Sequence, residues 1–384
     1  MTRNENAARI ALVHDWLVTL GGSEVVLREI RRLYPEADVF CVIDGLSNAD
    51  RERLGVGRPT TTWLQRVPMV QRLYRGLLPL MPSAIEALDL SGYDLVISSS
   101  HAVAKGVRPS GTALHVCYCH SPMRYAWDMQ DTYLGEAGLR GGPRRWLVAQ
   151  LLARLRAWDR RSASRVQAFV ANSAFVGARI ARAYERTSTV VHPPVDTDFF
   201  TVDPAVSRGA HYLTASRLVG YKRVHTIVEA FRDLPDRQLV VVGDGPERDR
   251  VLAAAGPNVT WKGRIDDHAL RNEMRRARAF LFAAEEDFGI LPVEAQACGT
   301  PVIAFGRGGA LETVTPETGA FFAEATPQAI AEAVRGFERG ATPSAAACRG
   351  NAERFSTERF HREFRGLVES LWAAHLSRAT PPAP

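Results

Sequence analysis

RAFLFAAEEDFGILPVEAQACGTPVIAFG (residues 278–306) is an apolar strand, a loop with three acids, a helix and a second apolar strand. The helix is expected to begin at Pro292, with Glu294 in its first turn, and to stop at Gly299, because proline suits helix starts and glycine helix ends. Two buried strands joined through a helix form a parallel βαβ unit. This stretch therefore predicts a parallel sheet covered by helices.

The same alternation of short apolar strands and longer helical patterns continues along the whole chain. Near-continuous runs of Val, Ile, Leu and Phe are typical of strands buried on both faces, so parallel sheets are expected. Strand–helix alternation predicts doubly wound α/β domains. The expected strands are 9–17, 37–44, 93–100, 113–120 and 166–173, followed by 211–218, 237–245, 259–265, 278–284 and 301–306.

The length of 384 residues favours two domains, and VVHPPVDTDFF (190–200) is the expected boundary because consecutive prolines cannot extend a helix. We expect domains at 1–192 and 193–355 with a cleft between them. Residues 356–378 read as one amphipathic helix with Ser356 as its N-cap, before a short tail to residue 384. Ligands in such sheets bind beyond the carboxyl ends of the strands, so sites are expected in the loops that follow strands.

The composition narrows the classes of protein to which the chain can belong. The net charge of +6 and the pI of about 9.2 suit an anionic partner. The five cysteines suggest no disulfide framework, which favours a reducing compartment. The first residues lack the apolar core of a secretion signal, and no run approaches the roughly 20 apolar residues of a membrane span. We expect a cytoplasmic protein, soluble or attached to a membrane surface.

The acidic loop and the helix after it suggest a ligand with two kinds of group. The amides of Gly289, Ile290 and Leu291 lie at the helix start and are suited to a phosphate. A carboxylate would repel phosphate, so Glu286 and Glu294 are expected to accept hydrogen bonds from hydroxyls instead. A diphosphate flanked by two sugar rings satisfies both. The alternative is that Glu294 only stabilises the helix N-terminus.

A second loop in the same half carries two cations. ASRLVGYKR (215–223) follows a strand and contains Arg217 and Lys222, which suit a diphosphate leaving group. Alone, this loop would be interpreted as a solvated basic loop. VVGDGPE (241–247) is a strand–turn–helix segment without the third glycine of a dinucleotide fingerprint, and is interpreted as a tight turn near the nucleotide.

In the first half, HDWLVTLGGSE (14–24) places Gly21 and Gly22 between a strand and a helix, either for close ligand approach or as a flexible turn. YCHSPMRYAWD (118–128) ends a strand at His120. Its Cys117–Cys119–His120 cluster lacks the paired second half of a zinc site, so no metal is predicted. Two basic, apolar segments (63–82 and 143–165) suit either an anionic membrane surface or ordinary core-facing helices. No nucleic-acid motif is present.

In order along the chain, HPPVDTDFF, SRLVGYKR, VVGDGPE, KGRIDD, EDFGILPVEAQACGTPVIA and FGRGGALETV resemble the motifs of family-4 retaining glycosyltransferases. YCHSPMRYAWD resembles a bacterial, mannosyltransferase-like branch involved in surface polysaccharide assembly. The resemblance implies a GT-B fold, with two Rossmann-like domains facing each other across a cleft. The C-terminal domain would hold the nucleotide sugar, the N-terminal domain the acceptor, and the last helix would cross back to the first domain.

The resemblance also implies roles for residues. Arg217 and Lys222 would stabilise the diphosphate, Glu286 would bond donor-sugar hydroxyls, and Glu294 the ribose. Gly21 and Gly22 would approach the phosphate or sugar from the opposite side, and His120 would lie near the reacting sugar. The remaining implied site residues are Arg264 of KGRIDD and the amides near Ile290 and Leu291. The implied reaction transfers mannose from GDP-mannose, with retention and without metal or cofactor, to a glycan or polyprenyl-diphosphate-linked acceptor.

Four alternatives to this reaction remain open from the sequence. The donor could be a UDP-sugar. A sugar-nucleotide 2-epimerase shares the architecture and would change the donor without any acceptor. An oxidoreductase would need a dinucleotide-type glycine turn after the first strand, which HDWLVTLGGSE does not supply. A catalytically inactive binding subunit is disfavoured by the intact acids and basic pair.

Overall fold

The computed structural model describes residues 8–127 and 142–379, which leaves out the proline-rich tail and Asp128 at the end of the 118–128 motif. The chain forms two compact units. Unit 1 comprises Met1–His192 and His361–Pro384, and unit 2 comprises Pro193–Phe360. Each unit is a parallel sheet covered by helices on both faces, as in a Rossmann-like domain.

The strands of the unit 1 sheet are β1 (Ile10–His14), β2 (Asp38–Cys41), β3 (Thr60–Thr61), β4 (Leu95–Ser100), β5 (Leu114–Cys119), β6 (Ala168–Ala171) and β7 (Ser188–Val190). Their order in the sheet is β3-β2-β1-β4-β5-β6-β7. Every pairing in it is parallel. The strand order reverses between β1 and β4, where His14 lies directly beside Ser99 in the register.

The strands of the unit 2 sheet are β8 (Tyr212–Ala215), β9 (Leu239–Val242), β10 (Val259–Trp261), β11 (Ala279–Phe282), β12 (Val302–Phe305) and β13 (Gly319–Phe322). Their order is β10-β9-β8-β11-β12-β13, again with parallel pairing. The strand order reverses between β8 and β11. Alternate residues of these strands enter two separate hydrophobic clusters, one on each face, as the two-residue period of a strand requires.

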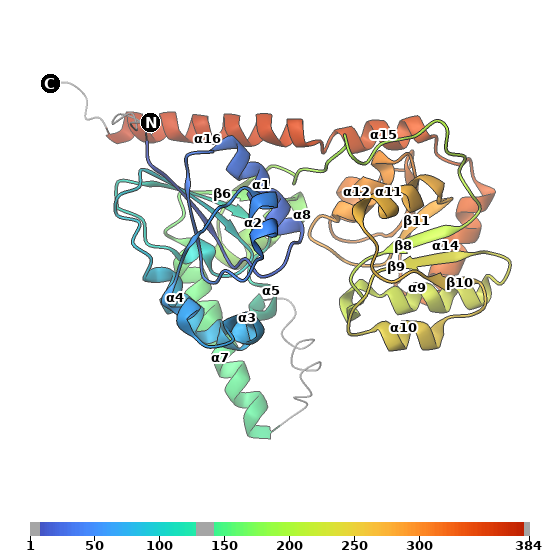
Figure 1. Cartoon of the computed structure of the whole chain (residues 1–384), viewed down its shortest axis with the longest axis horizontal. Coiled ribbons are helices and arrows are strands. Elements are labelled where there is room, and N and C mark those ends of the chain that lie inside the picture. Colours follow the sequence, from blue (N-terminus) through green and yellow to red (C-terminus); the bar gives the residue numbers. More distant parts are fainter. Residues whose placement is uncertain (1–7, 128–141, 380–384) are drawn as a thin grey trace. The chain divides into compact units, whose positions relative to one another are not determined.

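Helices cover both faces of the unit 2 sheet (Figure 1). α11 (Asp267–Arg276), α12 (Ile290–Ala297) and α15 (Ala345–Glu353) supply one cluster, and α9 (Val224–Ala230), α10 (Arg248–Ala254) and α14 (Pro327–Arg339) the other. The remaining helix of unit 2 is α13 (Ala310–Thr313), and short 3-10 turns are η4 (Gly220–Lys222) and η5 (Phe231–Asp233).

The helices of unit 1 are α1 (Gly22–Leu33), α2 (Asn48–Leu54), α3 (Val70–Leu73), α4 (Met81–Glu86), α5 (Arg124–Trp127), α7 (Gly142–Ala163) and α8 (Ala174–Tyr184), with 3-10 turns η1 (Trp63–Arg66), η2 (Tyr74–Leu80) and η3 (Ala104–Gly106). α4 and α7 pack on one face of the sheet and share a cluster with β1 and β4. The helix α16 (Thr357–Ala379) belongs to unit 1 from His361 onward and runs beside α1 (Figure 1). His361 Nε2 lies 2.9 Å from Glu29 Oε2 of α1.

All ten strands expected from the sequence contain an observed strand. The strands that the sequence analysis missed are β3, β7 and β13, each at the edge of its sheet. These three edge strands are only partly buried, so they lack the continuous apolar run that marks a central strand. The N-cap prediction for the last helix is confirmed, because Ser356 Oγ accepts a hydrogen bond from the amide of Arg359.

One helix boundary was predicted wrongly. α12 begins at Ile290, two residues before the expected start at Pro292, so Glu294 lies beyond the first turn. Gly289, with a φ of 87°, is the N-cap in place of a polar side chain, which removes the usual sequence signal for a helix start. At the other end Gly299 has a φ of 81° and terminates the helix as expected.

Candidate functional site

The loops that follow β8 and β11 meet at the carboxyl edge of the unit 2 sheet. These strands are neighbours, but the chain leaves β8 toward β9 and β11 toward β12, so their following loops diverge and expose the sheet edge between them. η4 places Lys222 on one side of this point, and the acidic loop places Glu286 on the other. Lys222 Nζ donates a hydrogen bond to Glu286 Oε1, which joins two predicted site residues 64 positions apart.

The Lys222–Glu286 ion pair has chemical consequences for a ligand. Both side chains are partly exposed, at 14% and 20%, so a ligand can reach them. An ammonium binds phosphate oxygens and a carboxylate accepts hydrogen bonds from hydroxyls. A sugar diphosphate carries both kinds of group. Its phosphate can replace Glu286 as the partner of Lys222, and its sugar hydroxyls can replace Lys222 as the partner of Glu286. These are the two roles predicted for Lys222 and Glu286, and they stay predictions.

Glycines allow the surrounding loops to approach one another. A Cβ at Gly309 would collide with the Cα of Phe288, and the amide of Gly309 donates a 2.8 Å hydrogen bond to the carbonyl of Glu286. A Cβ at Gly243, whose φ is 125°, would collide with the carbonyl of Ser216 in the loop before Arg217. The glycines of FGRGGALETV and VVGDGPE therefore hold the basic and acidic loops in place.

The start of α12 contains the residues that the sequence predicts to hold a phosphate. Ile290 and Leu291 are the first two residues of the helix, and their amides have no partner within it, while Pro292 has no amide hydrogen. The structure thus places Gly289, Ile290 and Leu291 directly after the loop that carries Glu286. Two predicted cations, Arg217 and Arg264, are exposed in the loops after β8 and β10.

Glu294 lies on α12 in an acidic environment. Burial raises the pKa of its carboxyl to about 8, and the nearby Asp267 and Asp196 contribute to this rise. Asp267 is the last residue of KGRIDD and the first of α11, which explains how that motif reaches Glu294. Much of the Glu294 population is therefore protonated near neutral pH in the ligand-free protein.

In unit 1, hydrogen bonds join the predicted residues Gly21 and His120 at the β1/β4 reversal. The amide of Gly21 donates to Glu24 Oε2 over 2.9 Å, and Glu24 Oε1 lies 3.4 Å from His14 Nε2. His14 Nδ1 lies 3.1 Å from Ser99 Oγ, which lies 2.8 Å from His120 Nε2. Gly22, the first residue of α1, follows directly. The glycine loop and the histidine predicted from separate motifs thus belong to one network.

Asp15 holds the loop after β4 beside this network. Its buried carboxylate accepts hydrogen bonds from the four amides of residues 101–104, at 2.6–3.0 Å, and lies 3.0 Å from His101 Nδ1. Burial alone would raise the pKa of Asp15, but His101, these hydrogen bonds and His14 hold it well below its usual range. His101 packs edge-on against Trp16 with 4.7 Å between ring centroids.

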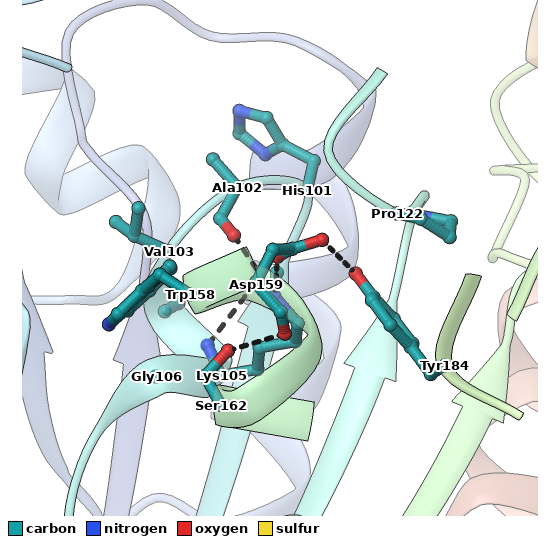
Figure 2. A network of polar contacts seen from close by, with 12 residues as sticks. His101, Ala102, Val103, Lys105, Gly106, Pro122, Trp158, Asp159, Ser162 and Tyr184 are labelled. Atoms are coloured by element: carbon teal, nitrogen blue, oxygen red, sulfur yellow. Dashed lines mark hydrogen bonds and ion pairs between the residues drawn. The ribbon is translucent and has the colours of Figure 1, made fainter. Parts of the chain in front are cut away.

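A second carboxylate, Asp159 of α7, ties the loops after β4 and β5 to the body of unit 1 (Figure 2). It is fully buried and pairs with the equally buried Lys105 of η3. Its other oxygen accepts 2.8 Å hydrogen bonds from Trp127 Nε1 of α5 and the Tyr184 hydroxyl of α8. Lys105 directly follows the segment that Asp15 holds, and α5 follows His120, so Asp159 supports both sides of the candidate site.

Sequence reasoning missed the residues that connect this unit 1 site, namely His14, Asp15, Glu24, Ser99 and His101. Two signals pointed to them. Three serines end the strand LVISSS (95–100), where a buried parallel strand should be apolar, and the first strand ends at His14, which Asp15 follows directly. The thiols of Cys117 and Cys119 instead enter a hydrophobic cluster with Phe169, away from the Ser99–His120 contact.

Comparison with solved structures defines the class of fold. Sucrose-phosphate synthase from Thermosynechococcus elongatus aligns with a TM-score of 0.72 at 19% identity, covering 96% of this chain and 100% of that one. Anabaena HepE, solved in complex with UDP, aligns with a TM-score of 0.70 at 19% identity, covering 94% and 100%. These likenesses, with two doubly wound parallel sheets, define the chain as a GT-B protein.

Sequence comparison then gives the family. The model for "Glycosyltransferase Family 4" matches residues 20–199, and the model for "Glycosyl transferases group 1" matches residues 201–355. The chain belongs to glycosyltransferase family 4.

Curated relatives share shorter segments with the chain. A GDP-mannose-dependent monoacylated alpha-(1-6)-phosphatidylinositol monomannoside mannosyltransferase of Corynebacterium glutamicum is 38% identical over 119 residues, which is 27% of this chain and 31% of that protein. A GDP-mannose-dependent alpha-(1-6)-phosphatidylinositol monomannoside mannosyltransferase of Mycobacterium tuberculosis is 32% identical over 171 residues, 37% of this chain and 44% of that protein. The matched segments thus span less than half of these relatives.

Proposed function

We propose that this protein transfers a hexose, mannose from GDP-mannose, to a glycan or polyprenyl-diphosphate-linked acceptor, with retention at the anomeric carbon. The observation that carries the proposal is the Lys222–Glu286 pair at the reversal of the unit 2 sheet. It offers one group for a diphosphate and one for sugar hydroxyls within bonding distance of each other. The names of the matched mannosyltransferases support mannose and GDP as the first choice.

In the proposed reaction the acceptor oxygen bonds to the anomeric carbon while the bond from that carbon to the diphosphate breaks. The acceptor's proton passes to the departing phosphate oxygen, so atoms and charge balance without a protein base. Negative charge grows on the leaving group, and Arg217, Lys222 and the amides of Ile290 and Leu291 stabilise it there. We propose that these groups replace a metal ion, and that the protein binds no cofactor besides its donor.

The experiment incubates the protein with radiolabelled GDP-mannose or UDP-glucose and a polyprenyl-diphosphate glycan, with and without EDTA. We expect transfer from GDP-mannose that EDTA does not reduce, and an α-linkage in the product by NMR. Loss of transfer in EDTA would overturn the metal-free chemistry alone, and an inverted linkage would overturn retention alone. Transfer from neither donor would overturn the proposal.

Two alternatives have their own signatures in this experiment. A UDP-sugar donor is suggested by HepE, which was also solved with UDP-glucose, and it would appear as transfer from UDP-glucose only. A 2-epimerase would convert the donor in the absence of acceptor, which NMR of the donor alone detects.

The environment of Glu294 predicts a pH dependence of nucleotide binding. Ribose hydroxyls donate to an ionised carboxylate, so Glu294 must lose its proton, whose pKa is about 8. The affinity for GDP should therefore rise with pH, by about tenfold between pH 7 and pH 9, and level off above the pKa. Isothermal titration calorimetry over this range measures it.

Two variants test the assignment of this pH dependence. Glu294→Gln cannot ionise and should bind weakly with no rise in this range. Asp267→Asn removes a neighbouring negative charge and so lowers the pKa of Glu294. The increase in GDP affinity should then occur at lower pH. A rise that persists unchanged in Glu294→Gln would assign the dependence to another group.

We further propose that unit 1 contacts the surface of an anionic membrane. None of the helices in residues 8–127 and 142–379 is long and apolar enough to span a bilayer. The start of α7 exposes Trp146 and Leu147 by 65% and 64%, directly after Arg144 and Arg145. The following turns of α7 and the 63–82 segment contribute to the same hydrophobic cluster. This segment also exposes Met69 by 66%. Adjacent exposed apolar and cationic side chains suit an anionic surface.

Flotation with phosphatidylglycerol vesicles tests the membrane proposal. The wild type should float with the vesicles, and Trp146→Ser with Leu147→Ser should reduce the bound fraction by at least ~tenfold, since two large apolar groups are lost. Leu311→Ser, an equally exposed leucine (58%) of unit 2, should float normally. Absence of wild-type flotation, or equal loss in both variants, would contradict the proposal.

A further inference from the structure

Arg223 has a strained backbone conformation beside the candidate site. It directly follows Lys222 and has a φ of 53°, in the left-handed region that residues with a side chain rarely adopt. Among residues 8–127 and 142–379, the other non-glycine residues with a positive φ are Met69 and Glu185, both in unit 1. In the described part of unit 2, this kind of strain therefore occurs only at the end of the turn η4, which carries Lys222.

The side chain of Arg223 compensates for this strain by stacking on an aromatic ring. Glycine would adopt the same φ without a steric clash, so an arginine here needs a contact that glycine cannot make. In the described part of the chain its guanidinium forms no ion pair, and its Nη1 is enclosed without a hydrogen-bond partner. Its Cζ lies 5.1 Å from the centroid of the Phe305 ring instead. A planar, weakly hydrated guanidinium is well suited to such a stack.

The Arg223–Phe305 contact joins the two sides of the loop that carries Glu286. Arg223 lies in the segment after β8, and Phe305 is the last residue of β12. β11 lies between these two strands in the sheet, and Phe282 at its end pairs in register with Ala304 of β12. The Glu286 loop therefore leaves β11 close to the level of Phe305. The side chain of Arg223 holds the turn on one side of this loop against the strand on its other side.

The same contact fixes the backbone from which Lys222 reaches Glu286. The amide of Lys222 donates a 3.0 Å hydrogen bond to the carbonyl of Val219, and the amide of Arg223 a 3.1 Å hydrogen bond to the carbonyl of Gly220. Both residues thus belong to one tight turn, and from this turn Lys222 Nζ donates to Glu286 Oε1. A cation is most effective on a leaving group when it already lies where the negative charge will develop. A held turn meets that requirement.

We propose that Arg223 is a positioning residue, whose stack on Phe305 holds the strained turn so that Lys222 is preset to neutralise a departing diphosphate. Arg223 itself does not touch the donor. The effect on catalysis rests on the proposed glycosyl transfer, whereas the held turn does not. With a looser turn the donor would still bind, but Lys222 would be aligned with the leaving group for only part of the time. The value of kcat should therefore fall more than the affinity for GDP.

Two substitutions of Arg223 separate the stack from the strain. Arg223→Ala loses the stack and keeps a strained φ, so its Tm should be lower than that of the wild type. Arg223→Gly also loses the stack, but glycine adopts this φ without strain, so its Tm should be higher than that of Arg223→Ala. If Arg223 only stabilised the fold, the glycine variant would regain activity together with stability. If Arg223 positions Lys222, activity should stay low in both variants.

Hydrogen exchange of the ligand-free full chain, measured by mass spectrometry, tests whether Arg223 holds the turn. The amides of residues 217–224 should exchange about tenfold faster in Arg223→Ala and Arg223→Gly than in the wild type, because the turn opens more often without the stack. Arg307→Ala is the matched control, since it removes a second guanidinium that lies 5.7 Å from the same ring but comes from the loop after β12. Exchange of residues 217–224 should stay within twofold of the wild type in this control.

Either of two exchange results would overturn the proposal. Unchanged exchange of residues 217–224 in both Arg223 variants would show that the stack does not hold the turn. Equal acceleration in Arg307→Ala would assign the effect to the surroundings of Phe305 rather than to Arg223. Because exchange is measured without substrate, it decides the held turn even if the wild type transfers sugar from no donor. Failure of the proposed function is thus distinguishable from failure of this inference.

Transfer kinetics with GDP-mannose test the role of Arg223 in the reaction. We expect kcat about tenfold below the wild type in both Arg223 variants, with the affinity for GDP within threefold. Glu185→Gly is the control for relief of strain, because Glu185 has a φ of 56° at the C-cap of α8 in unit 1. This variant should leave kcat unchanged and should not lower the Tm. Recovery of wild-type kcat in Arg223→Gly would show a purely structural role and contradict the proposal.

Discussion

Arg217→Ala should lower kcat for sugar transfer by at least ~100-fold, which corresponds to a loss of about 2.7 kcal/mol of transition-state stabilisation. Arg217 lies in the loop after β8, five positions before Lys222, which bonds Glu286. A guanidinium there gains interaction as the diphosphate departs, because the negative charge grows only in the transition state. The affinity for the intact donor should therefore fall much less than kcat.

The controls separate chemistry from stability. Arg217 is exposed and pairs with no carboxylate in the described part of the chain, so its removal should leave the melting temperature unchanged. Arg250→Ala removes another exposed arginine of unit 2, whose partner is Glu247, and should leave both kcat and stability near wild type. A turnover for Arg217→Ala within threefold of the wild type would remove this residue from the proposed leaving-group site.

The sequence was informative about the fold wherever local pattern and tertiary environment agree. The central strands, such as β9 and β11, are buried on both faces and keep their apolar runs, so periodicity located them. β3, with the sequence TT, has no such run because its place at the sheet edge comes from pairing with β2. The start of α12 was misplaced for a related reason, since Gly289 caps it through backbone geometry.

The unit 2 part of the candidate site could be predicted from the sequence, and the unit 1 network could not. The need of a sugar diphosphate for both a cation and a hydroxyl acceptor assigned Lys222 and Glu286 to one site from the sequence, and the two side chains are bonded in the folded chain. The unit 1 network was not predictable, because His14 and Ser99 lie in β1 and β4, His120 directly follows β5, and the three meet only through the register of these strands. No spacing within one segment of sequence encodes that register. The roles of all these residues in catalysis stay predictions until the variants are measured.

Asp159→Ala should destabilise unit 1 by about 3–5 kcal/mol, because it leaves the ammonium of Lys105 buried without its anion. Lys105 is 1% exposed, and the hydroxyl of Tyr184 and the indole of Trp127 would lose their acceptor as well. Such a loss is a large part of the roughly 5–15 kcal/mol that stabilises a typical domain. Urea unfolding followed by tryptophan fluorescence reports on unit 1, since all tryptophans except Trp261 belong to it.

The neighbouring residue of the same helix provides the contrast. Arg160 pairs with Glu185 on the surface, with both side chains at least half exposed, so Arg160→Ala should cost less than about 1 kcal/mol. Replacing both buried partners, with Lys105→Met and Asp159→Leu, should recover much of the stability lost in Asp159→Ala, because a buried ion pair is costly to break but often replaceable by apolar groups. If Asp159→Ala cost no more than Arg160→Ala, Asp159 would not anchor the loops after β4 and β5. A loss of transfer activity in Asp159→Ala would then need another cause. If unit 1 is destabilised as expected, the same loss is explained by greater mobility of the loops that hold His101 and His120.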